Sequence, residues 1–336
     1  MTIVRGISCL LCASCFVACS DDGVAGDGQD ATAPSTTVSS TDATGSEDTS
    51  DTPTSMTGSE SPSATQDGSG SEDPSGDPST TDDPGDTSQS TTDTEGPGPF
   101  ALPPPDGGLD YQLGGAYTPP AGVTIVSRDR NASPEPGIYN ICYINGFQAQ
   151  PDEEDFWLNE HPDLVLRDGN GDPVIDQDWD EMLLDTSTPE KREALAEIVG
   201  GWIAQCGMDG FDAIEIDNLD SYSRSQDLLT QDNAVDFMVL LSAAAHDGGL
   251  AIAQKNSTEL VPRKDEMGTD FVVAEECNTY SECGDYIDGY GDAVLMIEYQ
   301  QNDFDTGCTE YPGYSIVLRD VDLVPEGDGG YVYDNC

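Results

Sequence analysis

The sequence is poor in basic residues and in histidine. Only 11 Lys and Arg stand against 66 Asp and Glu in 336 residues, which gives a formal net charge of −55. Nucleic-acid binding is therefore excluded, because it depends on Lys and Arg that neutralise phosphates. The two histidines, His161 and His246, cannot build a three-histidine metal site, and a Ser/His/Asp triad could draw on no others. Carboxylates remain as the abundant chemically active side chains.

Aromatic residues are missing from a long stretch near the N-terminus. Residues 20–99 contain 18 acids, no bases and no Phe, Tyr or Trp, and consist largely of Ser, Thr, Asp, Gly and Pro. Such a composition cannot bury enough apolar area to offset the entropy of ordering the chain. We therefore predict that residues 19–99 form a disordered acidic tether.

The apolar run at the N-terminus is too short to span a bilayer. It extends from Ile7 to Ala18 after Arg5, and this arrangement predicts an export signal over residues 1–18. Phe16-Val17-Ala18-Cys19 resembles a bacterial lipobox, which implies a lipidated Cys19 that anchors the protein to a membrane. We expect a lipoprotein facing the periplasm or the cell exterior; the alternative is simple secretion after Ala18.

Residues 100–336 contain no C-x-x-C motif, which argues against zinc. An even number of cysteines in an exported chain favours disulfides, and six cysteines allow 15 connectivities. Cys277 and Cys283 are close enough in sequence to pair locally. We expect Cys142 with Cys206 and Cys308 with Cys336 as the other pairs, although the sequence does not select them among the alternatives.

Short apolar runs alternate with helical stretches along residues 100–336, as in repeated βα units with a parallel sheet. Thr188-Pro189-Glu190 predicts the start of a helix that ends at Gly207, and a second helix is expected over Asp232–His246. Eight strands in one domain of this length predict a (β/α)8 TIM-like barrel. Its first helix is expected to be truncated, because Asp129–Ile138 is too short for one. The predicted strands are Val123–Arg128, Ile138–Asn145, Met182–Asp185, Phe211–Asp217, Leu250–Lys255, Phe271–Glu275, Ala293–Tyr299 and Tyr314–Leu318.

Polar residues collect at the carboxyl ends of these strands, where such barrels place their active sites. The densest group is Asp209–Asp220, in which Glu215 and Asp217 share one face of a strand because side chains alternate with a period of two. Two carboxylates directed into a barrel repel each other unless one is protonated, paired or used in chemistry. We expect Lys255 to be a charge partner for Asp217 or Glu215.

Several motifs, which follow one another along the chain in the order of the family, resemble those of glycoside hydrolase family 114, the endo-α-1,4-polygalactosaminidases. The resemblance covers most of residues 109–320. Its strongest element is the stretch Gly210–Asp220 followed by Tyr222. The other elements are Ile141-Cys142-Tyr143, Leu184-Asp185, Gln254-Lys255-Asn256, Ala274-Glu275-Glu276-Cys277 with Cys283, and Ile297-Glu298-Tyr299.

The resemblance implies a (β/α)8 barrel that cleaves α-1,4-linked galactosamine polymers, with Asp217 and Glu275 as the catalytic pair. General glycosidase chemistry then suggests Asp217 as nucleophile and Glu275 as acid/base in a retaining mechanism. Glu276 leaves the identity of the acid open, although strand alternation directs only one of the two neighbours inward. Substrate contacts are expected from Tyr143, Asp185, Glu215, Asn218, Tyr222, Lys255, Asn256, Glu276 and Glu298, with Trp179 as a further sugar platform.

The acidity of the chain offers a physical link to a cationic amino-sugar polymer, because a carboxylate-lined cleft attracts free amines. Solubility alone is the competing explanation for most of the acids. We expect a monomeric enzyme with a galactosamine-rich polysaccharide as substrate and without a cofactor or metal. The alternatives are a non-catalytic surface carbohydrate-binding protein and a glycosidase for another amino-sugar polymer.

Overall fold

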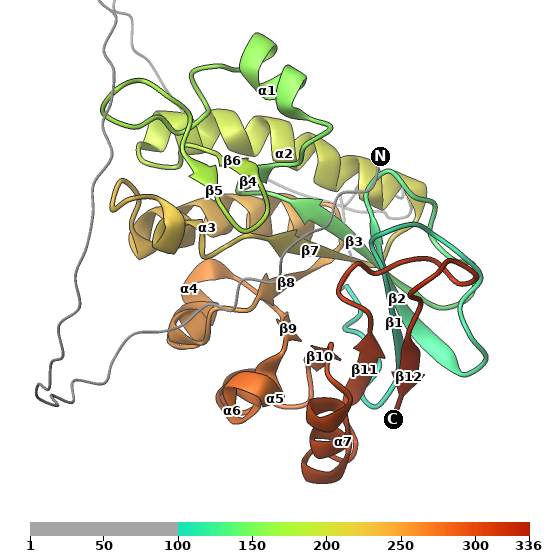
Figure 1. The fold of residues 1–336 in the computed structure, drawn as a ribbon. Helices are drawn as coiled ribbons and strands as arrows, with labels where there is room; N and C mark the ends of the chain where they lie inside the picture. The colour runs from blue at the N-terminus through green and yellow to red at the C-terminus, as the bar shows by residue number, and fades with distance from the viewer. Residues whose placement is uncertain (1–99) are drawn as a thin grey trace, which may run out of the picture. The chain divides into compact units, whose positions relative to one another are not determined.

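The computed structural model describes residues 100–336 (Figure 1). The predicted signal sequence, Cys19 and the acidic tether lie outside the described residues. Within residues 100–336, the helices lack the combination of length and hydrophobicity that a membrane span requires.

The core of the fold is a nine-stranded sheet that curls into a barrel. Eight strands run parallel in the order β1, β2, β3, β7, β8, β9, β10 and β11, and β12 pairs antiparallel with β11. Arg319 at the end of β11 reaches across to the carboxylate of Asp110 and the carbonyl of Tyr111 on β1. The (β/α)8-type barrel is thereby confirmed. The strands are β1 (Gly108–Gln112), β2 (Val123–Asp129), β3 (Tyr139–Asn145), β7 (Ala213–Asp217), β8 (Ala251–Lys255), β9 (Phe271–Glu275), β10 (Val294–Glu298), β11 (Ser315–Arg319) and β12 (Tyr333–Asn335).

A small antiparallel sheet lies between β3 and β7 in the chain, with strand order β4 (Gln148–Ala149), β6 (Glu181–Leu183) and β5 (Ile175–Asp176). The prediction of Met182–Asp185 as a barrel strand was therefore wrong. Met182 and Leu184 are buried, but they pack in the outer core with Trp157 of α1 (Glu154–Glu160). The first place in the barrel belongs instead to β1, so β7 remains the fourth strand.

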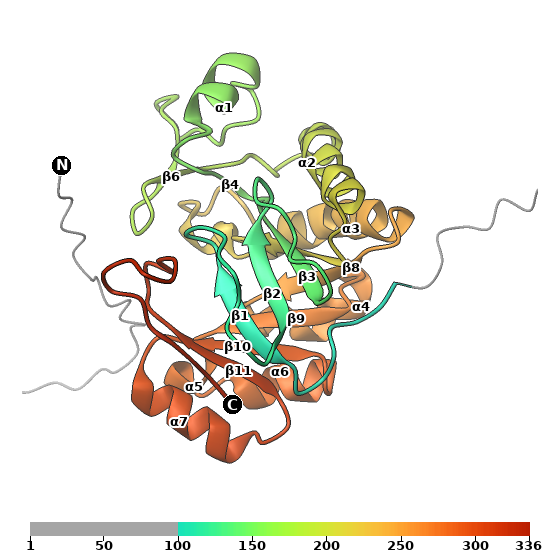
Figure 2. The ribbon, with the colours of Figure 1, turned by 90° about the vertical axis from the view of Figure 1, so that its right-hand side faces the viewer.

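Helices cover the outer face of the sheet from β3 onwards, whereas loops alone join β1 to β2 and β2 to β3 (Figure 2). The predicted truncation of the barrel is thus confirmed. The helix predicted at Thr188 begins there, because the Thr188 hydroxyl accepts a hydrogen bond from the amide of Lys191 and Gly210 ends the helix at φ 98°. The remaining elements are α2 (Pro189–Asp209), η1 (Ser221–Arg224), α3 (Gln231–Asp247), η2 (Thr258–Arg263), α4 (Lys264–Met267), α5 (Cys277–Tyr280), α6 (Cys283–Tyr290) and α7 (Gln301–Glu310).

Three disulfides cross-link the described part of the chain, one of them to a barrel strand. Cys142–Cys206 joins β3 to α2, Cys277–Cys283 joins α5 to α6, and Cys308–Cys336 joins α7 to the C-terminus. All three expected pairings are confirmed.

Alternation along the strands divides the core into two layers. Alternate residues such as Ile141, Ala253 and Val273 fill the barrel interior, and their neighbours pack under the helices. The last inward-facing residue of each strand therefore lies at the carboxyl end of the barrel.

Candidate active site

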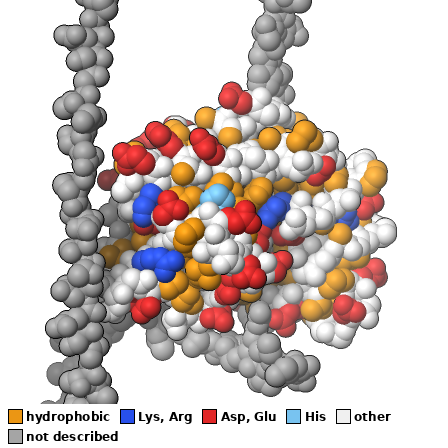
Figure 3. Space-filling model, turned by 90° about the horizontal axis from the view of Figure 1, so that it is seen from above, with side chains coloured by type: hydrophobic (Ala, Val, Ile, Leu, Met, Phe, Trp, Pro, Cys, Tyr) orange, Lys and Arg blue, Asp and Glu red, His pale blue; other side chains and the backbone are white. Residues whose placement is uncertain are grey.

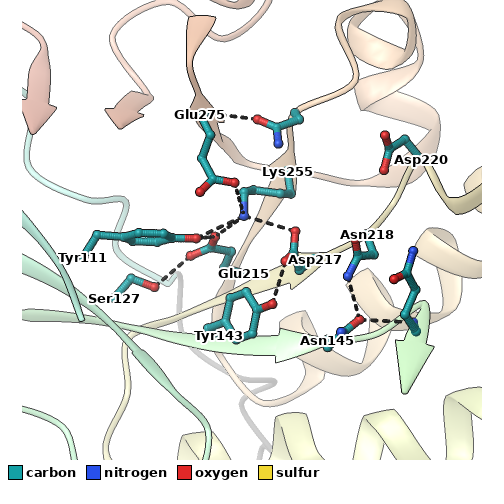
Figure 4. Close-up of polar contacts among 12 residues, drawn as sticks. Tyr111, Ser127, Tyr143, Asn145, Glu215, Asp217, Asn218, Asp220, Lys255 and Glu275 are labelled. Carbon is teal, nitrogen blue, oxygen red and sulfur yellow. Dashed lines mark hydrogen bonds and ion pairs between the residues drawn. The ribbon is translucent and has the colours of Figure 1, made fainter. Parts of the chain in front are cut away.

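Three neighbouring strands bring their last inward-facing side chains together at the carboxyl end of the barrel (Figure 4). Glu215 and Asp217 come from β7, Lys255 from β8 and Glu275 from β9. The expectation that Glu215 and Asp217 share a face is confirmed, because one ammonium group contacts both carboxylates.

The Lys255 ammonium is the centre of this cluster. Its Nζ lies 3.1 Å from Asp217 Oδ1, 2.9 Å from Glu275 Oε2 and 3.2 Å from Glu215 Oε1. Burial acts to lower the pKa of Lys255, but the carboxylates of Asp217 and Glu275 more than offset it and hold that pKa well above its ordinary value. The lysine is therefore a fixed positive charge at neutral pH.

Solvent exposure separates the three carboxylates. The side chains of Asp217 and Glu275 are 20% and 23% exposed, whereas those of Glu215 and Lys255 are 0% and 2% exposed. A ligand entering from the carboxyl end can therefore meet Asp217 and Glu275 but not Glu215.

Glu215 is held from below by two hydroxyl groups. Tyr111 on β1 donates to its Oε1 at 2.5 Å and Ser127 on β2 donates to its Oε2 at 2.7 Å. Burial raises the pKa of Glu215 against the opposing effect of Lys255. Glu215 was expected to contact substrate, but the structure makes it a support for Lys255.

Asp217 is held in its ionised form. Burial acts to raise its pKa, but Lys255, the Tyr143 hydroxyl at 2.6 Å and the backbone amide of Asn218 outweigh that effect, so the pKa is lowered. An ionised carboxylate that still reaches solvent is suited to act as a nucleophile.

Glu275 is positioned by its neighbours on three sides. Tyr299, which follows β10, donates a hydrogen bond to Oε1, and Lys255 contacts Oε2. The Asn256 side chain accepts a hydrogen bond from the Glu275 backbone amide at 2.8 Å. Asn256 thus orients the strand end, and Glu275 rather than Glu276 faces the cluster. Because oxygens of Asp217 and Glu275 lie near the same nitrogen, those two oxygens are at most about 6 Å apart.

An amide chain extends the site toward the small sheet. Asn218 donates to Asn145 Oδ1 at 3.1 Å, and Asn145 donates to Glu181 Oε2 at 2.9 Å. Burial raises the pKa of Glu181 to about 7, and repulsion from Asp217 adds to this effect. Glu181, the first residue of β6, was not foreseen from the sequence.

Several expected site residues lie outside the cluster. Asp185 pairs with Lys191 and accepts from Ser187 at the start of α2. Glu298 faces the outer layer, where its Oε1 accepts two hydrogen bonds from Asn278 at 2.9 Å each. These two placements correct the expectation that both contact substrate.

Three further expected contacts lie at the periphery. The Tyr222 hydroxyl donates to Glu259, which links η1 to η2 after the carboxyl ends of β7 and β8. Glu276 precedes α5 without capping it through its side chain, and burial and repulsion from Glu275 raise its pKa. Trp179, in the hairpin between β5 and β6, is 54% exposed.

Two tyrosines in the cluster were missed by sequence reasoning. Tyr111 lies on β1, which was not predicted as a strand. Tyr299 lies within a predicted strand, but its neighbour Glu298 was chosen because it is acidic. The period of two offered a signal, since Leu295, Ile297 and Tyr299 share the inward face.

Within residues 100–336, potential metal ligands come together only at Cys277, Cys283 and Glu298. The two cysteines form a disulfide and are not available as thiolate ligands.

Two solvent-facing carboxylates at the carboxyl end of a parallel barrel lie where enzymes of this fold place their active sites. Family comparison narrows this class. Residues 89–336 match glycoside-hydrolase family GH114, and the chain belongs to this family. The protein is therefore a glycosidase.

Two solved structures are similar to the chain, and the first shares its fold. Ega3 from Aspergillus fumigatus, crystallised with galactosamine, is 21% identical; the match covers 70% of this chain and 99% of Ega3, with a TM-score of 0.56. The glycoside hydrolase domain of PelA from Pseudomonas aeruginosa is 16% identical; the match covers 67% of this chain and 98% of that domain, with a TM-score of 0.44. No curated protein matches the chain.

Proposed function

We propose that the protein is an exported glycosidase that cleaves α-1,4-linked galactosamine polymers with retention of configuration. The observation that carries the proposal is the pair of solvent-facing carboxylates, Asp217 and Glu275, on either side of the buried Lys255 ammonium. The two oxygens that contact Lys255 lie at most about 6 Å apart, so both carboxyl groups can reach one glycosidic bond.

In the first step, an oxygen of Asp217 bonds to the anomeric carbon while the glycosidic bond breaks. Glu275 must be protonated at the start of this step, and it gives that proton to the departing oxygen. In the second step, Glu275 takes a proton from water, the water oxygen bonds to the anomeric carbon, and the ester bond to Asp217 breaks.

Lys255 keeps the charge balanced through this cycle. Negative charge leaves Asp217 when it is glycosylated and is created on Glu275 when it loses its proton. Because Nζ lies within 3.1 Å of both carboxylates, the moving charge stays beside the same cation. Such a fixed charge stabilises the transition state without reorganisation during the reaction.

Electrostatics and the fold support galactosamine as the sugar. Residues 100–336 carry 48 acids and 10 bases, and acidic side chains outnumber basic ones on the face shown in Figure 3. A cationic polymer is attracted to such a surface, whereas an acetylated one gains nothing from it. Ega3, which shares the fold, binds galactosamine in its crystal.

Export is supported by the three disulfides, which persist in oxidising compartments. We further propose that Cys19 carries the lipid anchor, as the N-terminal motif predicts.

The variants Asp217→Asn and Glu275→Gln test the mechanism. Each should lower kcat on a deacetylated galactosamine polymer by about 10²–10⁴-fold or more and leave polymer binding intact. Glu197→Gln, an exposed acid on α2, is the matched control and should keep wild-type turnover. Oligosaccharide release is followed by mass spectrometry, and proton NMR identifies the first anomer formed.

A first product in the β configuration would contradict retention. Turnover in either variant above about a tenth of the wild-type value would remove that residue from the catalytic pair. A wild-type protein that binds the polymer without cutting it would instead be a carbohydrate-binding protein.

A further inference from the structure

Beside the catalytic pair lies an acid that the reaction does not use. Glu181 begins β6, is half-buried, and accepts a hydrogen bond from Asn145 through Oε2 at 2.9 Å. Asn145 sits opposite Asp217 in the register of β3 and β7. The amide of Asn145 therefore fixes the Glu181 carboxylate at the edge of the cluster, close enough for Asp217 to repel it.

The hairpin that carries Glu181 is anchored to the barrel. Asp176 of β5 is 1% exposed; it pairs with Arg224 Nε at 2.6 Å and accepts from Gln148 Nε2 at 3.1 Å. Arg224 in turn donates to Asn218 Oδ1 at 3.2 Å and pairs with Asp220. The hairpin is thus joined to the loop that follows Asp217, so Glu181 is held in place.

Within the described part of the chain, Glu181 forms no ion pair, although the positive charge of Arg224 acts to lower its pKa. Lys255 forms ion pairs with Asp217, Glu275 and Glu215, and Arg224 pairs with Asp176 and Asp220. Among residues 100–336, no Lys, Arg or His side chain forms an ion pair with Glu181. A partly buried carboxylate that has no ion-pair partner favours an incoming cation.

An exposed aromatic ring belongs to the same hairpin. Trp179 precedes Glu181 by two residues and is 54% exposed. Indole faces attract ammonium groups and pack against sugar rings. A carboxylate and an indole on one anchored hairpin are suited to hold a sugar that carries a positive charge.

We propose that Glu181 binds the ammonium group of a galactosamine unit in a subsite next to the catalytic pair, with Trp179 as the adjoining sugar platform. This inference rests on the proposed function. It adds that the Glu181 carboxylate distinguishes a sugar with a free amine from an acetylated sugar. An acetamido group has no charge to pair with Glu181, so the subsite selects deacetylated units.

The test is the variant Glu181→Gln, which keeps the shape of the side chain and can still accept the hydrogen bond from Asn145. On a deacetylated galactosamine polymer, KM should rise about tenfold and kcat should stay within about twofold of the wild-type value. The wild-type KM should also rise with salt more steeply than that of the variant, because salt screens the ion pair. Glu197→Gln should match the wild type in all three measurements.

A second variant, Glu181→Asp, retracts the carboxylate by one methylene and should give a KM between those of the wild type and Glu181→Gln. A lowered kcat with unchanged KM in Glu181→Gln, or an unchanged salt dependence of KM, would overturn this inference and leave the proposed function standing. If the wild-type protein cuts no galactosamine polymer, the proposed function fails and the inference fails with it.

Discussion

Replacement of Lys255 by Met tests the charge arrangement of the site directly. The ammonium is 2% exposed and touches three carboxylates, so its removal leaves buried negative charge without a partner. Breaking a buried ion pair in this way costs about 3–5 kcal/mol of stability. Loss of one preorganised electrostatic contact lowers kcat by about 10²–10³-fold. We expect both effects in Lys255→Met at pH 7, measured by urea unfolding and by release of reducing ends.

The stability deficit should depend on pH. The pKa of Lys255 is raised in the folded state, so its contribution is complete below its unfolded pKa of about 10.5 and is lost only as pH rises through the folded value. The pKa of Asp217 is lowered, so its contribution is present above about pH 4 and is lost as pH falls through the folded value. Both contributions are therefore complete at pH 7.

In Lys255→Met, Asp217 can lose its charge by protonation, and the difference in unfolding free energy from the wild type should shrink toward pH 4. Circular dichroism at low temperature confirms that the variant is folded before its kinetics are measured. A variant with kcat within about threefold of the wild-type value, or with an equal stability deficit at pH 4 and pH 7, would refute the role given to Lys255.

Two further changes address Asp217 and the disulfides. Tyr143→Phe removes the hydroxyl that lowers the pKa of Asp217, so the acid limb of the pH profile of kcat/KM should move to higher pH; an unmoved limb would contradict this. Replacing Cys142 and Cys206 together by Ala opens a link across 64 residues and should lower the unfolding free energy by about 4 kcal/mol, measured by denaturant titration, whereas a loss below about 1 kcal/mol would show that the link contributes little.

The parallel strands of the barrel were predictable because they are buried on both faces. The predicted runs Phe271–Glu275 and Ala293–Tyr299 are largely apolar, and the structure confirms strands at Phe271–Glu275 and Val294–Glu298. β1 was missed because its outward face is polar. Asp110 and Gln112 are fully buried there, but Arg319 and Arg128 satisfy them, and the sequence does not reveal partners so distant in the chain.

The pairing of strands was harder to predict than their existence. Met182–Leu184 is as apolar as a barrel strand, yet it belongs partly to the small antiparallel sheet. An apolar run predicts that a strand is buried, but it does not predict which of the two sheets the strand joins. The hairpin that carries Glu181 was unpredictable for the same reason, since its position depends on the buried contact between Asp176 and Arg224.

Within the candidate site, period-two alternation correctly placed Glu215 and Asp217 on one face but could not tell which of them reaches solvent. That difference comes from depth, because Glu215 lies one inward position deeper in the barrel. At that depth the hydroxyls of Tyr111 and Ser127 complete its hydrogen bonds and close it off from a ligand.

The buried residues Glu215 and Lys255 explain how the side chains of Asp217 and Glu275 stay close together without a substrate. Glu215 lies deeper in the barrel and pairs with the Lys255 ammonium. That ammonium lies between Asp217 and Glu275 and pairs with both. Three contacts, from Tyr111, Ser127 and Lys255, oppose the desolvation of Glu215 and fix its position. A solvent-exposed lysine in the same place would be screened and mobile, and would fix neither carboxylate. The spacing of the proposed nucleophile and acid therefore depends in part on Lys255 and Glu215, whose side chains are 2% and 0% exposed.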